Sequence, residues 1–336
     1  MTRLHPDLLA GYRGAADLPG YDRRTVRAGI LHLGVGAFHR AHQAHYVDLL
    51  LDRAPDWGIV GASLRRGDMR AALAPQEGLY VLAVRGGEGL SARVIGALLD
   101  VLDGGADPAP VLAAMADPGI RLVTLTVTEK GYCSSGGRLD ASHAEVAADL
   151  AGRSPRSVPG LLCAGLAARR AAGAGPVTLL SCDNLGSNGK VLESVVTDFA
   201  RAQRDGLDAW IAGHVTFPCS MVDRITPATT EADRAEITTL TGLEDAWPVV
   251  TEPFSQWVIE DRFAAGRPPF EAVGVEMVAD VAPYEDMKLR LLNGAHSTMA
   301  YWGQLRGHAL VADCVADAEF VEILTRTARE EVFRRW

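Results

Sequence analysis

The stretch Ile30-Leu31-His32-Leu33-Gly34-Val35-Gly36-Ala37-Phe38-His39 decides the fold, because it passes from a strand pattern through a glycine turn into a helix pattern. Its first four residues are typical of a short buried strand, and the residues after it are helix-like as far as about Leu51. Gly34 allows the tight turn. Gly36 lets the backbone approach a pyrophosphate, whose charge meets the free amides at the helix start. The stretch outlines the dinucleotide-binding fingerprint, with His39 where the third glycine usually stands.

The residues after the next strand bear on the choice of dinucleotide. A second strand is predicted from Gly58 to Leu64, at the spacing of one crossover unit, and Arg65, Arg66 and Asp68 come directly after it. An acidic side chain here binds the ribose hydroxyls of NAD, whereas arginines favour the additional phosphate of NADP. Because both charges are present, the prediction tilts toward NAD and leaves NADP open.

The chain continues with alternating strand and helix patterns. We predict strands at 79–84, 120–127, 177–182, 214–221, 254–259 and 273–281, and helices at 108–116, 159–172 and 190–204. This alternation is typical of an α/β protein with a Rossmann-like, doubly wound, mostly parallel sheet. Residues 152–160 are interpreted as a connection between two helices. From Tyr284 on the pattern is helical, through Gln304 and again over 318–334.

Polar side chains stand at the carboxyl ends of several predicted strands. Ligands bind at that edge of an open parallel sheet, so we expect these side chains to converge on one site. Besides the glycine turn, the stretches concerned are Thr126–Lys130, Ser181–Asn184 and Ser220–Arg224. For Asp183, Asn184 and Asp223 taken singly, a role as turn former or helix cap remains the alternative.

A second candidate site lies in the helical run that contains Lys288. With Lys288 at zero and about 100° per residue, Glu285 falls near roughly 60°, His296 near roughly 80° and Asn293 near roughly 140°. Four polar groups then share one face of the helix. A surface helix with an ordinary Glu285–Lys288 pair at i,i+3 spacing is the alternative interpretation.

The apolar residues of the same run suggest what surrounds that face. Leu289, Leu292 and Met299 are expected to pack into a core, which would make the polar face the lining of a cleft. A lysine in such a cleft loses its preference for the charged form and can act as a base.

Composition excludes several classes of protein. The 336 residues are 48% hydrophobic and 22% charged, as in ordinary globular proteins, and suffice for one large or two moderate domains. A net charge of −9 argues against a nucleic-acid surface and against adhesion to anionic membranes. The chain has no long apolar window and no signal core, so we expect a soluble, cytoplasmic protein. The five cysteines lack Cys-x-x-Cys spacing and are expected to be reduced and mostly buried.

Three histidines spaced three apart, His39, His42 and His45, raise the question of a metal. A tetrahedral site needs ligands that converge on a point, usually with a further ligand elsewhere in the chain. We expect no metal here. His39 is interpreted as a cap of the cofactor turn, and the other two as packed or solvated.

Six motifs in the same order resemble the polyol-specific long-chain dehydrogenases, the family of mannitol 2-dehydrogenase and fructuronate (mannonate) reductase. They are Leu33–His42 (LGVGAFHRAH), Thr126–Tyr132 (TVTEKGY), Ser181–Asn184 (SCDN), Thr216–Ile225 (TFPCSMVDRI), Glu252–Asp261 (EPFSQWVIED) and Lys288–Ser297 (KLRLLNGAHS). The resemblance implies an NAD(P)-dependent, zinc-independent oxidation of a secondary alcohol to a ketone, with a lysine as general base. It also implies that His39 belongs to the family's own version of the glycine turn.

The resemblance assigns roles to individual residues. Lys288 is implied to take the hydroxyl proton while hydride leaves for the nicotinamide. Asn184 and Asn293 match two amides that hold the substrate oxygen. The remaining matches are His296 as a substrate-contacting imidazole, Asp223 as a carboxylate that orients the polar network, and Glu285 as a residue that passes the proton from lysine to water.

The cofactor contacts that we expect lie in the turn and at strand ends. They are Gly34, Val35, Gly36, Ala37, Phe38 and His39, then Arg65 and Asp68, and finally Thr128 and Glu129. The expected cofactor is NAD, with NADP as the second candidate. The expected partner is a small polyol, ketose or sugar acid, without nucleic acid or membrane, and the protein is expected to be a monomer or small homo-oligomer.

We predict two domains. Residues 1–283 form the NAD(P)-binding domain with extra strands, and residues 284–336 begin an all-helical C-terminal substrate domain that is cut short relative to the family. The expected reaction is of the mannitol/fructose or the mannonate/fructuronate type. A sugar acid needs a cationic anchor, for which Lys130, Arg224 and Arg290 are candidates. A non-catalytic NAD-binding module, or an inactive fragment of such an enzyme, is the alternative function.

Overall fold

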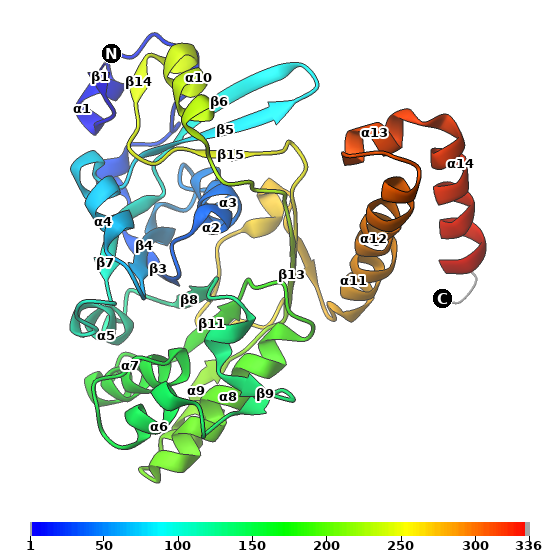
Figure 1. The fold of residues 1–336 in the computed structure, drawn as a ribbon. Coiled ribbons are helices and arrows are strands. Elements are labelled where there is room, and N and C mark those ends of the chain that lie inside the picture. Colours follow the sequence, from blue (N-terminus) through cyan, green and yellow to red (C-terminus); the bar gives the residue numbers. More distant parts are fainter. Residues whose placement is uncertain (1, 333–336) are drawn as a thin grey trace. The chain divides into compact units, whose positions relative to one another are not determined.

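The computed structural model describes residues 2–332 and divides the chain into two compact units, Met1–Ala279 and Asp280–Trp336 (Figure 1). Each unit has its own secondary structure and its own buried cluster. Over residues 2–332, none of the helices has the length and apolar character that crossing a lipid bilayer requires.

The first unit is built on a six-stranded sheet in which all neighbouring strands are parallel. The strand order is β12-β11-β8-β3-β4-β7. The strands are β3 (Ala28–Leu33), β4 (Gly58–Ser63), β7 (Leu98–Asp103), β8 (Leu122–Leu125), β11 (Val177–Ser181) and β12 (Val215–Thr216). The first strand of this sheet in the sequence, β3, lies in the middle. Strands β4 and β7 follow on one side of it, and β8, β11 and β12 follow on the other. The predicted doubly wound parallel sheet is confirmed, and its order reverses between β3 and β8, where such sheets bind ligands.

Alternate residues of β3 enter two separate cores, because successive side chains of a strand point to opposite faces. Ile30 packs with Tyr46 and Val47 of α3 (Gln43–Asp48), whereas Leu31 and Leu33 join the core on the other face. That second core is covered by α5 (Ala109–Ala116), α7 (Val158–Ala172), α8 (Asn188–Gln203) and α9 (Leu207–His214). The three predicted helices in this region are confirmed, and residues 152–160 join α6 (Ala144–Leu150) to α7 as expected.

A second sheet explains one wrong assignment. The strand predicted at 79–84 forms as β5 (Tyr80–Gly86), but it belongs to a four-stranded sheet with the order β15-β5-β6-β2. The other members are β15 (Val249–Thr251), β6 (Gly89–Ile95) and β2 (Ala16–Asp17), and α10 (Glu231–Thr241) packs against the sheet. The sequence prediction lacks β6 and the main-sheet strand β7.

A third sheet divides what the sequence predicts as one strand at 214–221. Val215–Thr216 is β12 of the main sheet, whereas β13 (Ser220–Asp223) pairs antiparallel with β16 (Gln256–Glu260), which pairs with β17 (Glu276–Val278). Pro218 lies between the two pieces and has no N–H to donate to a ladder, so a continuous strand cannot form. The start of β13 still lies beside β11, because the Ser220 hydroxyl donates to the Ser181 carbonyl oxygen at 2.6 Å.

The remaining α-helices and β-strands of the first unit are short. They are α1 (Pro6–Leu9), α2 (Ala37–Ala41), α4 (Asp68–Leu73), and the two-residue strand pairs β1 (Thr2–Arg3) with β14 (Leu243–Glu244) and β9 (Ser134–Ser135) with β10 (Arg138–Leu139). All five cysteines of the chain are buried free thiols, as expected.

The second unit is helical. Its first rod alternates α-helical and π-helical turns: α11 (Ala282–Met287), a π turn (Lys288–Asn293), α12 (Gly294–Thr298) and a second π turn (Met299–Gly303). After it come α13 (Val311–Ala316), α14 (Ala318–Thr327) and a π turn (Ala328–Val332). The predicted helix over 318–334 is confirmed as far as residue 332, and its last two residues lie outside the described range.

Packing in the second unit differs from the sequence prediction. Met299 is buried with Cys314 and Phe320, but Leu289 is 61% exposed and Leu292 36% exposed. The expectation that these two leucines pack into a core is therefore wrong for the structure described. The physical reason is that the helices of this unit share only a small cluster of buried side chains.

Candidate functional site

The glycine loop between β3 and α2 is tightly constrained. Gly34 has a φ of 98°, and a Cβ there would lie 2.2 Å from the carbonyl oxygen of Thr126. Only glycine meets both conditions without strain. At Gly36 the nearest atom to a Cβ would be 3.8 Å away, so the space beside this residue is open. The loop thus combines a turn that requires glycine with a stretch of backbone that a ligand can approach.

The helix after the loop is shorter than predicted. The expected continuous helix to about Leu51 is interrupted at His42, which has φ −117° and ψ −85°, and it resumes as α3. The His42 ring is buried, and its Nε2 lies 2.9 Å from the carbonyl oxygen of Gln256. This tertiary contact outweighs the local preference for an unbroken helix.

Two stacked imidazoles lie under the loop. The rings of His32 and His39 are 3.4 Å apart and 8° from parallel, and both residues are fully buried. Nδ1 of His32 lies 2.8 Å from Thr124 Oγ1, and its Nε2 lies 2.9 Å from Thr126 Oγ1. Burial lowers the pKa of His32 to about 3 and holds the pKa of His39 well below its usual value. Neither ring nitrogen of His39 has a hydrogen-bond partner within residues 2–332, so this side chain supports the loop by packing and does not cap it.

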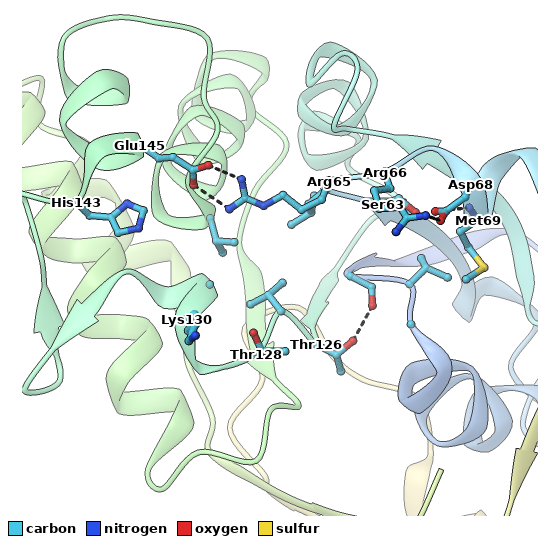
Figure 2. A pocket seen from close by; sticks show the side chains of 17 residues that line it. Ser63, Arg65, Arg66, Asp68, Met69, Thr126, Thr128, Lys130, His143 and Glu145 are labelled. Atoms are coloured by element: carbon cyan, nitrogen blue, oxygen red, sulfur yellow. Dashed lines mark hydrogen bonds and ion pairs between the residues drawn. The ribbon is translucent and has the colours of Figure 1, made fainter. Parts of the chain in front are cut away.

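A pocket of about 630 Å³ opens above the loop, at the carboxyl ends of the parallel strands (Figure 2). Its walls come from the glycine loop, from the end of β4, from the end of β8 and from the start of α6. Of the predicted cofactor contacts, Gly34, Val35, Gly36, Arg65, Asp68 and Thr128 line the pocket, and Ala37, Phe38, His39 and Glu129 do not. The lining also includes Ser63, Arg66, Lys130, His143 and Glu145. Most of the predicted cofactor contacts therefore lie together at the point where the strand order of the sheet reverses.

The charged groups of the pocket are arranged in pairs. Arg65 donates through both terminal nitrogens to the Glu145 carboxylate, and Nη2 lies 2.8 Å from Oε2 (Figure 2). Arg66 Nη2 lies 2.8 Å from an oxygen of Asp68. Hydrogen bonding to Arg65 lowers the pKa of Glu145, and the same bond raises the pKa of Arg65. The hydrogen bonds between Arg65 and Glu145 thus favour the charged forms of both side chains.

Backbone strain marks the end of β8. Thr128 has φ 65° and ψ 160°, a conformation that is essentially restricted to glycine and costs about 1–3 kcal/mol. Its N–H donates to Asp183 Oδ1 at 2.8 Å, and the N–H of Val127 donates to Oδ2 at 3.0 Å. Asp183 also accepts the hydroxyl of Tyr132 at 2.7 Å. One buried carboxylate at the end of β11 therefore holds the strained wall of the pocket, so for Asp183 the interpretation as a simple turn former is wrong.

The predicted catalytic residues are divided between the two units. Asn184 follows β11 directly after Asp183, and Asp223 is the last residue of β13 in the third sheet. The expectation that Asp223 stands at an end of the main parallel sheet is therefore wrong. Lys288, Asn293, His296 and Glu285 all lie on the first helical rod of the second unit.

The π turn changes the geometry of that rod. The N–H of Gly294 donates to the carbonyl oxygen of Leu289, a residue five positions earlier, as in a π-helix. Residues five apart then stand close to one above the other, so Lys288 and Asn293 are nearer in angle than the predicted separation of roughly 140°. Single π turns occur frequently at functional sites. The wider turn supports the grouping of these two side chains on one face.

Sequence reasoning missed three features of the site. Asp183 was expected at the shared edge of the sheet, with turn former or helix cap as the alternative, but its hold on the strained backbone of Thr128 was not predicted. Glu145 stands 80 positions after its partner Arg65 and carries no local signal. His32 interrupts an apolar strand, and this buried polar position is the one signal that points to the support under the loop.

The pocket fits a dinucleotide. The backbone beside Gly36 is open, the turn at Gly34 has no room for a side chain, and the wall at the end of β4 offers an acidic and two basic groups. Open backbone amides suit a pyrophosphate, and the charged wall suits a ribose. Within residues 2–332, no cluster of three or more His, Cys, Asp or Glu side chains is arranged to hold a metal ion.

Comparison with protein families matches both units. The mannitol dehydrogenase Rossmann domain matches residues 28–272, and the mannitol dehydrogenase C-terminal domain matches residues 280–334. A mannitol 2-dehydrogenase of Pyrenophora tritici-repentis is 47% identical over 326 residues, which is 94% of this chain and 58% of that protein. An uncharacterized oxidoreductase of Escherichia coli, YdfI, is 46% identical over 311 residues, 91% of this chain and 64% of that protein. The chain thus spans less than two thirds of the length of these curated relatives.

Two solved structures are similar throughout. A D-sorbitol dehydrogenase in substrate-free form has a TM-score of 0.94 and 39% identity, and covers 98% of this chain and 70% of its own. The mannitol 2-dehydrogenase of Pseudomonas fluorescens, in a ternary complex with NAD and D-mannitol, has a TM-score of 0.90 and 42% identity, and covers 99% of this chain and 70% of its own.

Proposed function

The chain belongs to the mannitol dehydrogenase family, and on that premise we propose that it is part of an NAD-dependent oxidoreductase that interconverts a secondary alcohol of a polyol and the corresponding ketose. The observation that carries the proposal is the pocket at the reversal point of the sheet. It is lined by a loop that requires glycine at position 34 and by the charged end of β4. NAD, when bound there, supplies the acceptor for the hydride.

The first unit binds and orients the cofactor in this proposal. The backbone around Gly36 contacts the pyrophosphate, and Asp68 accepts hydrogen bonds from the ribose hydroxyls. Thr128 forms the wall that Asp183 holds in place. Ala37, Phe38, His39 and Glu129 lie outside the lining. We assign the first three to the support of the loop, and Glu129 to the loop after β8.

The second unit supplies the proton chemistry in this proposal. Lys288 in its neutral form takes the proton of the substrate hydroxyl, and Glu285 passes it on to water. Asn293, together with Asn184 of the first unit, donates a hydrogen bond to the substrate oxygen as this oxygen gains negative character. His296 contacts the substrate, and Asp223 orients the polar network. No step in this scheme uses zinc.

The burial and the hydrogen bonds of Arg224 favour a neutral polyol over a sugar acid as the substrate. This side chain was one of three candidate anchors for a substrate carboxylate. It is buried, and its guanidinium donates to the carbonyl oxygens of Ala41 and Glu252. Of the other two, Lys130 lines the cofactor pocket, and Arg290 lies 3.7 Å from Asp286. A mannitol/fructose type of reaction therefore agrees better with these contacts than a mannonate/fructuronate type.

The test is a substrate panel with NADH on this chain and on a version extended to the length of its relatives. We expect NADH oxidation with fructose or a related neutral ketose, and less with fructuronate. NADH binding without oxidation of the cofactor in either version would favour a non-catalytic dinucleotide-binding module. Activity in the longer version alone would identify this chain as an inactive part of such an enzyme.

A further inference from the structure

The pocket holds more basic than acidic groups, yet two of its basic side chains already form ion pairs with carboxylates of the pocket. Arg65, Arg66 and Lys130 line it together with Asp68 and Glu145. A pocket with free arginines at the end of β4 would accept the 2′-phosphate of NADP, because arginine binds phosphate through paired N–H donors. Selectivity between the two dinucleotides therefore depends on what the arginines are bonded to.

The two ion pairs differ in kind. Arg66 and Asp68 are two residues apart, where the loop after β4 enters α4, with a distance of 2.8 Å between Nη2 and Oδ2, and the arginine side chain is 81% exposed. Arg65 and Glu145 come from separate elements, the end of β4 and the first turn of α6, and they meet through two parallel hydrogen bonds. A bidentate arginine–carboxylate pair uses the same donors that a phosphate would use. Glu145 therefore competes directly with a phosphate for Arg65.

Glu145 lies in the first turn of α6, and Arg65 is its hydrogen-bond partner in the pocket. Its side chain is 30% exposed, and the hydrogen bonds to Arg65 are the ones it makes among the described contacts. Figure 2 shows the Arg65 side chain extending toward Glu145, away from Asp68. The Glu145 carboxylate thus adds a negative charge to the pocket and also engages the hydrogen-bond donors of Arg65.

We propose that Glu145 is a specificity determinant for the cofactor: by engaging both terminal nitrogens of Arg65, it excludes the 2′-phosphate of NADP and makes the pocket selective for NAD. This inference rests on the proposed function and extends it to a residue outside the glycine loop and the end of β4. Replacement of Glu145 by glutamine keeps the size of the side chain, removes its charge and weakens the hold on Arg65. The freed guanidinium and the loss of a negative charge both favour a phosphate.

The experiment is a pair of fluorescence titrations, with NADH and with NADPH, at low ionic strength, where exposed charges are least screened. The proteins are the unaltered chain, Glu145→Gln, the double variant Arg65→Gln/Glu145→Gln, and Glu236→Gln. The last is a matched control, because Glu236 forms an exposed two-contact pair with Arg85 outside the pocket. It removes the same charge from the chain.

Glu145→Gln is expected to bind NADPH about fivefold or more tightly than the unaltered chain, with NADH affinity changed less than about twofold. The double variant should lose the gain, and Glu236→Gln should show none. Equal changes for both cofactors, no change for NADPH, or a gain that survives in the double variant would overturn the inference. If the unaltered chain binds neither NADH nor NADPH, the proposed function fails as well, whereas NADH binding with an unchanged NADPH affinity refutes only the role of Glu145.

Discussion

The two units contrast in how their apolar side chains are covered. In the first unit, the strands of the main sheet are buried on both faces and two large cores flank them. In the second, Met299, Cys314 and Phe320 form a small cluster, while Tyr301 is 73% exposed, Leu305 85% and Trp302 48%. The strained backbone of Thr128 persists only where the surrounding structure over-determines it, and the first unit provides such surroundings.

The contrast suggests a division of labour. The densely packed first unit, called the rigid unit below, holds the cofactor pocket. The sparsely packed second unit carries the proposed base, Lys288, on a helical rod with π turns. Regions with few buried contacts open at low free-energy cost, and catalytic elements that move are drawn from them. Four substitutions or conditions test this division, from the largest expected effect to the smallest.

Replacement of Lys288 by alanine is expected to break the chemistry and leave the cofactor site intact. Loss of a general base lowers the rate about 10²- to 10⁴-fold, whereas NADH affinity should change less than about twofold because the pocket lies in the other unit. The measurements are steady-state rates on the version of the protein that turns over, and NADH titration. Arg326→Ala, which removes another cation of the second unit, serves as the control. Appreciable activity in Lys288→Ala would refute the assignment of the base, and loss of NADH binding would refute the division.

Replacement of Gly34 by alanine is expected to break the rigid unit. The new Cβ would lie 2.2 Å from a backbone carbonyl oxygen at a φ of 98°, so we expect a loss of about 3 kcal/mol in the free energy of unfolding and a loss of NADH binding. Unfolding in urea, followed by the fluorescence of the buried Trp57 and Trp257, measures the first effect. Gly213→Ala is the matched control, since no atom lies within 4 Å of a Cβ there. If both alanine variants behave alike, the loop is less constrained than its geometry indicates.

The sequence predicted the rigid unit better than the other. The mostly apolar stretch Ile30–Leu33 predicts a buried strand, and Gly34 with Gly36 predicts the loop. The strand β7 was missed because Asp100 and Asp103 interrupt its apolar pattern, and the divided strand at 214–221 was missed because Pro218 was not weighed. The sequence carries no local sign of the bond between Glu145 and Arg65, which depends on the folded sheet. Nor does it show the π turns, since their hydrogen bonds differ from those of an α-helix by one residue in register.

Acid is expected to weaken the first unit through its buried histidines. The pKa of His32 in the folded protein is about 3, below the value near 6.5 of an unfolded histidine, because burial disfavours the charged ring. Below about pH 6.5 the unfolded chain binds the proton that the folded chain does not, so stability falls as the pH falls. One such histidine costs about 1.4 kcal/mol at pH 5.5 relative to neutral pH. His39, whose pKa is also lowered by burial, adds to the effect.

Urea unfolding at pH 7.5 and pH 5.5, with the same tryptophan fluorescence, measures this loss. His32→Asn should be less stable than the unaltered chain at pH 7.5 but should lose less on acidification. An unchanged pH dependence in this variant would show that His32 is not the group that titrates on unfolding.

The smallest effect is expected at Leu305, and it sharpens the contrast between the units most directly. Its side chain is 85% exposed, so Leu305→Ser should change the free energy of unfolding by less than about 0.5 kcal/mol. The counterpart in the first unit is Leu162→Ala, which empties a fully buried position on α7 and should cost about 3 kcal/mol. Both are measured by urea unfolding at pH 7.5. A large loss at Leu305 would mean that this leucine is covered in solution by contacts that residues 2–332 of one chain do not provide. The sparse packing described for the second unit would then reflect those missing contacts rather than the helices themselves.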